Sequence, residues 1–183
     1  MVFTLRGAQF SVRVQFAVFA ILCSVPAAAE VVAVSATGFA TRTVITVPGT
    51  PAAVYATVAS VQDWWDKAHT YSGDSRNMSL AATPGGCFCE KLPGGGVQHG
   101  TVVMAMPAQA LRVIGSLGPL QGMGVTGSLT WEFEQVPEGT KITQTYVVGG
   151  FPTMPFEKLA PLVDGVMSGQ MKALKAYADS KEK

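Results

Sequence analysis

The stretch of the sequence best suited to chemistry is PGGCFCEKLPGGGVQHG, residues 84–100. It places two thiols two residues apart, at Cys87 and Cys89, followed by a carboxyl at Glu90 and, beyond a glycine-rich turn, an imidazole at His99. Such groups can form a disulfide, bind a soft metal ion, react as thiols or transfer protons. The strand register decides among these roles, because neighbouring side chains of a strand point to opposite faces.

The turn between the two predicted strands decides which groups His99 meets. If Pro93 to Gly96 form a four-residue loop, Glu90 lies opposite His99 and both face the interior. A one-residue slip would instead place His99 on the cysteine face. We favour the four-residue loop, because it also puts Phe88 inside and leaves Lys91 in water. The sequence therefore predicts a cross-strand pair of Glu90 and His99, which is either a structural hydrogen bond or a general acid and base.

The two cysteines share one face of their strand. Residues two apart on a regular strand lie about 6.5–7 Å apart with parallel side chains, so a disulfide between Cys87 and Cys89 would need a bulge or a distortion. Two thiols with at most His99 or His69 fall short of the usual four ligands of a structural zinc site. We therefore expect free or half-buried thiols and no cofactor. Metal binding, redox chemistry and a distorted bridge remain alternatives for Cys87 and Cys89.

The start of the chain has the features of a secretory signal peptide. Arg6 and Arg13 precede an apolar run over residues 14–25, and three alanines at 27–29 provide a cleavage site. We predict a signal peptide over residues 1–29, cut before Glu30, and a periplasmic or secreted protein. The apolar run is shorter than the ~20 residues of a spanning helix, so no stable membrane span is expected after cleavage.

The charge of the expected mature chain excludes one class of partner. Cleavage removes two arginines and leaves 11 basic residues against 12 acidic ones, a formal charge of −1. Nucleic-acid binding domains carry a clustered positive charge instead. We therefore expect no nucleic-acid partner.

Residues 30–183 are expected to form one domain, because no linker or repeat divides them. A first strand lies within residues 31–47, and two short helices begin after Thr50 and Ser60. Short strand segments follow at 78–83, 86–92, 97–106, 109–118, 127–136 and 140–148, and an amphipathic helix covers 155–180. This order predicts an α+β fold, in which a curved antiparallel sheet of about seven strands wraps around the long C-terminal helix. A sheet and one helix leave an apolar cavity between them.

This order of elements resembles the helix-grip fold of the SRPBCC superfamily, which includes START and Bet v 1-like proteins. Within it, residues 38–180 are most similar to the group related to the activator of Hsp90 ATPase and to polyketide cyclases. The matching stretches are TPAAVYATVASVQDWW, HTYSGDSRNMSL, LRVIGSLGPLQG, LAPLVDGVMSGQMKAL and PGGCFCE, which replaces the group's usual Gly-Gly-x-Phe strand. The resemblance implies a ligand cavity. It does not carry over an Hsp90 partner, which is cytosolic, to a chain with an export signal.

Five residues are expected to meet a bound molecule. Trp65, Trp131 and Tyr146 would supply apolar contact, while Glu90 and His99 would hold a polar group of the ligand. Ligand-binding cavities commonly combine apolar walls with a few such polar groups.

The sequence around the two adjacent tryptophans is expected to border the cavity. Trp64 and Trp65 are neighbours on a short helix, so we expect one in the core and the other near the cavity mouth. By resemblance, the following loop with His69 and Tyr71 borders the entrance.

Four residues interrupt the apolar pattern of the final helix. Asp164 and Gln170 are expected to face solvent, as polar residues of a helix usually do. Gly165 and Gly169 cost helix stability and therefore suggest close approach to the sheet or to a bound molecule.

We therefore predict an exported protein that binds a small hydrophobic or amphipathic molecule. A cyclase or hydratase that uses Glu90 and His99 is one alternative, and a metal-binding or redox protein built on Cys87 and Cys89 is another. Nucleophile elbows, P-loops and dinucleotide fingerprints do not occur in the sequence. The pattern names neither the ligand nor the oligomeric state, and it leaves open whether a reaction is catalysed.

Overall fold

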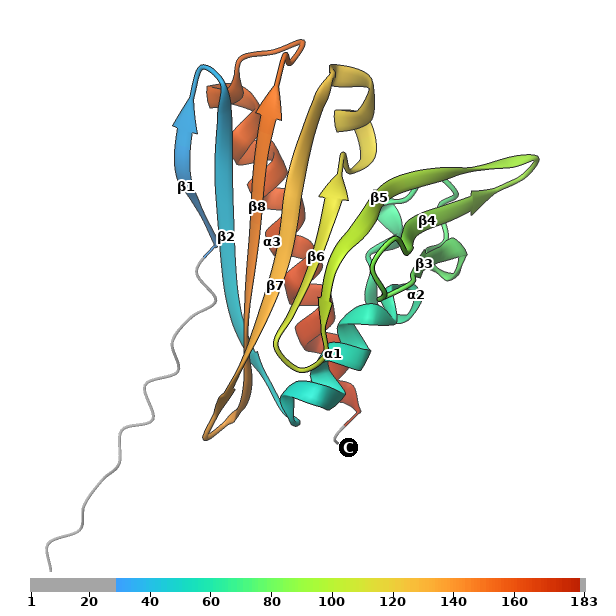
Figure 1. The fold of residues 1–183 in the computed structure, drawn as a ribbon, viewed down its shortest axis with the longest axis vertical. Helices are drawn as coiled ribbons and strands as arrows, with labels where there is room; N and C mark the ends of the chain where they lie inside the picture. Colours follow the sequence, from blue (N-terminus) through green and yellow to red (C-terminus); the bar gives the residue numbers. More distant parts are fainter. Residues whose placement is uncertain (1–28, 182–183) are drawn as a thin grey trace, which may run out of the picture.

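A curved antiparallel sheet wraps around one long helix, α3 (Phe156–Ser180), in the computed structural model, which describes residues 29–181 (Figure 1). The predicted α+β helix-grip fold is thus confirmed, with eight strands instead of about seven. The predicted signal peptide lies outside the described residues, except for Ala29, which begins the first strand. Within residues 29–181, no helix is long and apolar enough to cross a membrane.

The additional strand comes from the N-terminal segment, which folds into a hairpin. β1 (Ala29–Ser35) and β2 (Gly38–Val47) pair with Ser35 opposite Gly38, where the sequence predicted one strand over 31–47. The Ser35 hydroxyl accepts a hydrogen bond from the Thr37 N–H at 3.3 Å. This local bond stabilises the turn, and it is the kind of signal that a short serine–threonine motif gives.

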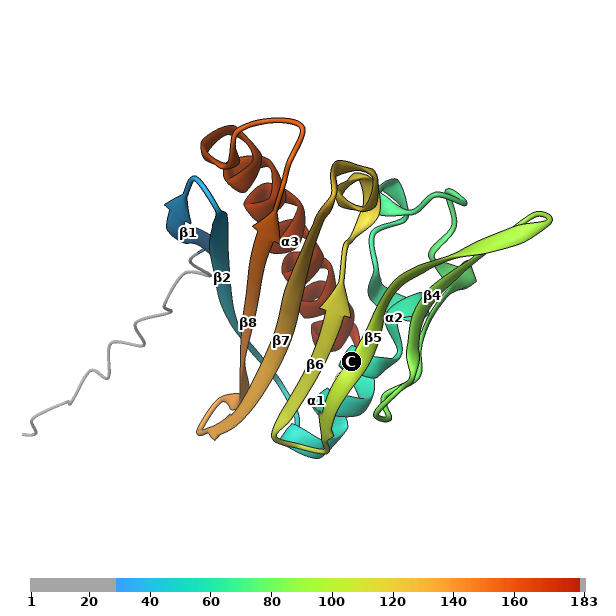
Figure 2. The same ribbon diagram turned by 45° about the horizontal axis from the view of Figure 1, so that its top comes forward.

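The remaining elements follow the predicted order. The helical segments are α1 (Pro51–Ala59), α2 (Val61–Trp64) and the 3-10 turns η1 (Lys67–His69), η2 (Ser75–Asn77) and η3 (Gly118–Met123). The other strands are β3 (Met78–Leu80), β4 (Cys87–Leu92), β5 (Gly95–Met106), β6 (Ala110–Gly115), β7 (Val125–Val136) and β8 (Gly139–Gly150). They form one sheet in the order β1-β2-β8-β7-β6-β5-β4-β3. Figure 2 shows α3 running across the concave face of this sheet.

The core lies between that concave face and α3. Inward side chains alternate with outward ones along β2, β7 and β8, as the period of two requires. Phe39 of β2 packs against Phe156 at the start of α3, with ring centroids 5.7 Å apart. Tyr55 of α1 packs against Phe133 of β7 at 5.5 Å. These contacts fix α3 at one end of the sheet and α1 near the other.

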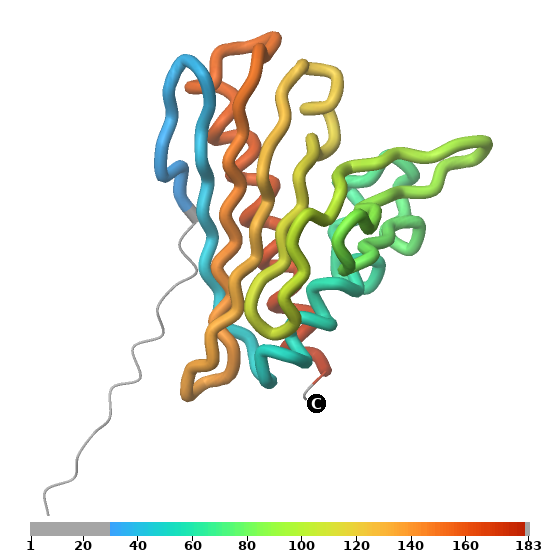
Figure 3. The backbone as a smooth tube through the Cα atoms, viewed as in Figure 1, coloured from blue at the N-terminus to red at the C-terminus, as the bar shows by residue number. Residues whose placement is uncertain are grey.

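The hairpin of β4 and β5 has a different register from the predicted one, and it extends away from the body of the sheet (Figure 3). Leu92 pairs with Gly95, so the turn has two residues rather than four, and Gly94 adopts a φ of 76° that suits glycine. The pairing shifts once more at a bulge, where Phe88 lies opposite Gly100 and Cys89 opposite Gln98. His99 is the extra residue of this bulge, because it has no pairing partner on β4.

Gly165 and Gly169 do not make a close approach to the sheet, which was one of the two alternatives that the sequence suggested. A Cβ atom built at either position meets no atom within 4 Å. Their cost in helix stability is therefore not repaid by packing against another element.

Candidate functional site

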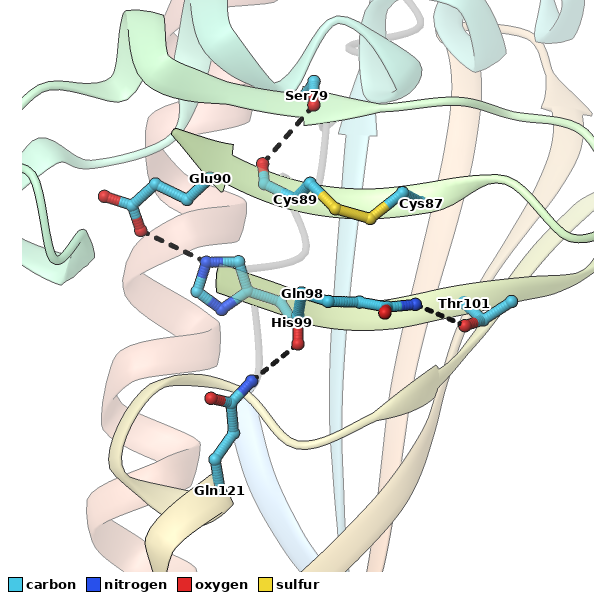
Figure 4. Close-up of a disulfide and its surroundings, with 8 residues drawn as sticks. All are labelled: Ser79, Cys87, Cys89, Glu90, Gln98, His99, Thr101 and Gln121. Atoms are coloured by element: carbon cyan, nitrogen blue, oxygen red, sulfur yellow. Dashed lines mark hydrogen bonds and ion pairs between the residues drawn. A yellow bond between two sulfur atoms is a disulfide. The ribbon is translucent and has the colours of Figure 1, made fainter. Parts of the chain in front are cut away.

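A buried pair of side chains joins β4 to β5 beside the concave face. His99 Nε2 lies 3.2 Å from Glu90 Oε2, and the two residues are only 4% and 1% exposed (Figure 4). The sequence predicted this pair, although through a different register. The bulge explains the contact, since it leaves His99 as the extra residue of β5 near Glu90.

The Glu90 carboxylate also binds the loop that follows α2. It accepts hydrogen bonds from the backbone N–H of Tyr71 at 3.1 Å and of Ser72 at 2.5 Å. With the bond to His99, three donors surround one buried carboxylate. A buried charge is tolerated only where such partners replace water, so this loop, β4 and β5 are held together through Glu90.

The electrostatics of the pair fix its protonation state. Burial alone would raise the pKa of Glu90, but hydrogen bonds from Ser72, Tyr71 and His99 outweigh it and lower this pKa below its usual value. Burial lowers the pKa of His99, and the attraction of Glu90 only partly opposes this effect. At neutral pH an ionised carboxylate thus faces a neutral imidazole. Because a carboxylate can only accept, Nε2 carries the proton and Nδ1 keeps its lone pair.

A cavity of about 410 Å³ lies in front of this pair, between α3, η3 and the loop after α2. His99 lines the cavity, whereas Glu90 lies behind it and does not. Apolar side chains form most of the wall. They include Trp65, Met78, Leu117, Leu120, Met123, Leu159, Val163, Val166 and Met167.

The loop that borders the cavity, residues 66–77, is fastened by short polar contacts. Asp66 caps η1 through the Ala68 N–H at 2.9 Å, and Asp74 caps η2 through the Arg76 N–H at 3.0 Å. The Asp66 N–H in turn donates to Gln170 Oε1 of α3 at 2.9 Å. Together with the bonds to Glu90, these contacts hold Tyr71 against the His99 ring, with centroids 6.1 Å apart and nearly parallel planes.

Two of the three predicted aromatic residues line the cavity and one does not. Trp65 lines it and donates its Nε1–H to the His69 carbonyl at 3.2 Å. Tyr146 also lines it, but its hydroxyl is 3.2 Å from the Gly115 carbonyl, and burial raises its pKa to about 12. Trp131 is fully buried and lies outside the lining, because it sits in the centre of β7 between its strand partners Leu111 and Gln144.

One of the adjacent tryptophans, Trp65, lines the cavity as predicted for one of the two, but both side chains are buried. Trp64 is 4% exposed and Trp65 is 6% exposed. The reason is that α2 ends at Trp64, and Trp65 has an extended backbone with ψ of 134°. The two side chains therefore leave the chain in different directions, with ring centroids 5.5 Å apart.

Gln170 is completely buried, where the sequence placed it in solvent. It anchors the loop through Asp66, as described above. The signal for this role was present, because Gln170 lies on the same helix face as Val166 and Leu174 in an otherwise apolar stripe. A single amide in such a stripe indicates a specific partner. The η3 segment and Met78 were not predicted as cavity wall, since only tertiary packing brings them there.

The cysteines form a disulfide, which corrects the expectation of free thiols. Cys87 and Cys89 are bridged with their Cα atoms 5.4 Å apart, shorter than the spacing on a regular strand. The distortion that such a bridge requires occurs at the bulge between β4 and β5. In the described part of the chain, no group of three or more His, Cys, Asp or Glu side chains could hold a metal ion.

Most of the chain is similar to known proteins in sequence pattern and in fold. A family model for polyketide cyclase / dehydrase and lipid transport matches residues 38–179. An uncharacterized protein from Rhizobium leguminosarum has a similar structure, with a TM-score of 0.59 at 16% identity over 80% of this chain and 97% of that one. No curated protein sequence matches.

Two further solved structures have the same fold. The Aha1 dimer from Colwellia psychrerythraea has a TM-score of 0.52 at 14% identity, over 75% of this chain and 94% of that one. The di-domain ARO/CYC StfQ from the steffimycin biosynthetic pathway has a TM-score of 0.55 at 13% identity, over 80% of this chain and 52% of that one. At such low identity, these likenesses concern the fold alone.

Acidification should destabilise the protein through His99. Burial lowers the pKa of this imidazole from 6.5, so the unfolded chain binds the proton first and stability falls as the pH drops below that value. Urea unfolding at pH 7 and pH 5 should show a loss of up to about 1.4 kcal/mol per pH unit, much of which His99→Gln removes. His69→Gln, which removes the other histidine, is the control. An equal loss in wild type and His99→Gln would contradict this assignment.

Proposed function

Because the chain belongs to the polyketide cyclase/dehydrase and lipid transport family, within the SRPBCC superfamily, we propose that its cavity binds a small hydrophobic or amphipathic molecule. One observation supports this most: a cavity of about 410 Å³ with apolar walls contains one buried imidazole whose second nitrogen is available. Small-molecule sites commonly have this size and combine such walls with few polar groups. A ligand would gain about 25 cal/mol for each Å² of apolar surface removed from water.

The polar end of the ligand is a hydrogen-bond donor in this proposal. His99 Nε2 is occupied by Glu90, and within residues 29–181 no protein hydrogen bond reaches Nδ1. The lone pair of Nδ1 accepts from a hydroxyl or an N–H group. The ionised Glu90 behind the ring disfavours an anion, because like charges repel strongly at a buried site. The preferred ligand is therefore a neutral apolar molecule with one donor group.

Enzymatic proton transfer is a second candidate, supported by the same pair. A carboxylate that accepts the proton of one imidazole nitrogen orients the ring and stabilises the imidazolium formed when the other nitrogen takes a proton. Glu90 has this position relative to Nε2, and His99 lines the cavity. The reaction class would be a cyclisation or dehydration that begins with removal of a proton by Nδ1.

We also propose that the protein acts outside the cytoplasm after removal of residues 1–29. The motif of Arg6, Arg13 and the following apolar run supports this proposal, and the Cys87–Cys89 disulfide is compatible with an oxidising compartment. The intact mass of the protein recovered from the periplasm or the medium should correspond to a chain that begins at Glu30. A chain that keeps residues 1–29 would contradict the proposal.

Filling the cavity should abolish ligand binding. Val163 of α3 is half-buried and lines the cavity, so Val163→Trp should weaken binding of the fluorescent probe N-phenyl-1-naphthylamine at least tenfold in a titration. The matched control is Val147→Trp, because Val147 is 50% exposed on β8 and lies outside the cavity. It should bind the probe as the wild type does.

The same titration tests the polar end. The probe N-phenyl-1-naphthylamine carries an N–H donor, whereas 1-anilinonaphthalene-8-sulfonate has the same rings with a negative charge. The neutral amine should bind more tightly, because Glu90 disfavours the anion. Equal binding of the amine to wild type and Val163→Trp would contradict the cavity proposal.

Glu90→Gln should separate catalysis from binding. The amide can donate to Nε2 and so favours the tautomer with the proton on Nδ1, which removes the base but leaves the apolar wall intact. A suitable test reaction is the ring opening of 5-nitrobenzisoxazole, which begins when a base removes its C–H proton. If the pair is a base, wild type should accelerate this reaction and Glu90→Gln should lose about 10²-fold or more of the rate. Probe affinity should fall only several-fold, because the acceptor on Nδ1 is lost while the apolar wall stays intact. If the wild type does not accelerate the reaction, the enzymatic hypothesis is contradicted and ligand binding remains the proposed function.

A further inference from the structure

We propose that the Cys87–Cys89 disulfide is a redox switch that decides whether His99 faces the cavity. In the oxidised protein, His99 lies inside and pairs with Glu90. In the reduced protein, the tip of the β4–β5 hairpin shifts by one residue and Gln98 takes the place of His99. The part of this inference that concerns ligand binding rests on the proposed function.

The disulfide lies on the outer face of β4. Cys87 and Cys89 are half-buried, whereas Phe88 between them and Glu90 after them are buried on the inner face. The bridge and the Glu90–His99 pair are close in the chain and lie on opposite sides of the strand (Figure 4). A reductant can therefore reach the sulfur atoms without entering the cavity.

The disulfide and the bulge are two parts of one distortion. A regular strand separates Cα atoms two residues apart by about 6.6 Å, but the bridge holds those of Cys87 and Cys89 at 5.4 Å. A strand distorted in this way does not keep a regular ladder, and its pairing with β5 is interrupted at this point, where β5 has one additional residue. That residue is His99, so the contraction of β4 and the bulge of β5 occur together.

A regular alternative for the hairpin exists. Beyond the bulge, Phe88 pairs with Gly100 and Cys87 with Thr101. If this pairing continued without a bulge, Cys89 would lie opposite His99, and Glu90 would lie opposite Gln98. Such a one-residue shift moves the β5 side chains of the tip to the other face of the sheet, while the β4 side chains stay where they are. His99 would then point outward and Gln98 inward.

The sequence of the turn permits both registers. Pro93 is followed by three glycines, so the turn can contain two residues, as observed, or three. The shift would remove little apolar surface from the interior, because Val97 is the one apolar residue of the β5 segment 95–99 and is only half-buried. Gln98 now lies outside, where its amide donates to Thr101 Oγ1 at 2.8 Å. Facing Glu90, the same amide could donate to the carboxylate instead.

The bridge contributes little to overall stability, which suits a switch. It closes a loop of only three residues, and the loss of entropy in the unfolded chain is smallest for the shortest loops. Its reduction by a dithiol transfers two electrons and two protons. The bond between the Cys87 and Cys89 sulfur atoms breaks, two thiols form, and the dithiol becomes a cyclic disulfide.

The register is measured by NMR on the protein with labelled histidine, with and without dithiothreitol. We expect reduction to move the His99 ring signals and to raise its pKa toward 6.5, because the ring then lies in water away from the desolvation that lowers it. Cross-strand contacts of Cys89 should change from Gln98 to His99. Affinity for N-phenyl-1-naphthylamine should fall several-fold as the acceptor leaves the cavity.

The double variant Cys87→Ser, Cys89→Ser is the matched control. It should show the reduced pattern with or without dithiothreitol, which separates loss of the bridge from other effects of the reductant. Identical His99 signals in the oxidised, reduced and double-serine proteins would overturn the switch. Unfolding of the reduced protein would also overturn it, because the bridge would then be a general support of the fold.

The two readouts separate this inference from the proposed function. If the His99 signals move on reduction but the probe binds neither form, the switch stands and the binding proposal fails. If the probe binds both forms equally and the His99 signals do not move, the binding proposal stands and the switch is wrong.

Discussion

The burial of one carboxylate is the constraint on which the site depends. Glu90 is 1% exposed, and a charge in such a place is stable only when hydrogen bonds replace its water. Its partners come from two other parts of the chain, namely Tyr71 and Ser72 in the loop and His99 on β5. The requirement to satisfy one charge therefore fixes the loop position, the hairpin contact and the imidazole tautomer together.

Several polar groups in or beside the cavity wall already have a partner within the protein. Trp65 and Tyr146 line the cavity, and the indole N–H of the first and the hydroxyl of the second are each bonded to a backbone carbonyl. Gln170 comes from the helix that forms one wall, but its Oε1 accepts the Asp66 N–H. Besides His99, the polar side chains of the wall come from His69, Thr70 and Tyr71 in the loop, and the rest of the wall is largely apolar. Small-molecule sites commonly combine apolar walls with a few polar groups in this way.

The Glu90–His99 pair was predicted correctly from an incorrect register, and the reason is physical. The real turn is two residues shorter than the predicted one, and a shift of two residues keeps every side chain on its original face. His99 therefore points inward as predicted, although the predicted register was wrong. The bulge then made it the additional residue of β5, at the same point of the hairpin as the bridged cysteines Cys87 and Cys89. Neither the bulge nor the bridge follows from alternation.

The α+β helix-grip fold, the order of the elements and the inward face of most strands could be predicted from the sequence, because they follow from local periodicity and turn residues. The sequence also contained the family resemblance over nearly all of residues 38–179. Three features required the three-dimensional structure: Trp131 lies outside the cavity, Gln170 anchors the loop, and the cysteines are bridged. These features depend on distances between atoms, set by packing of segments far apart in the chain and by distortion of one strand, and periodicity contains no information about either.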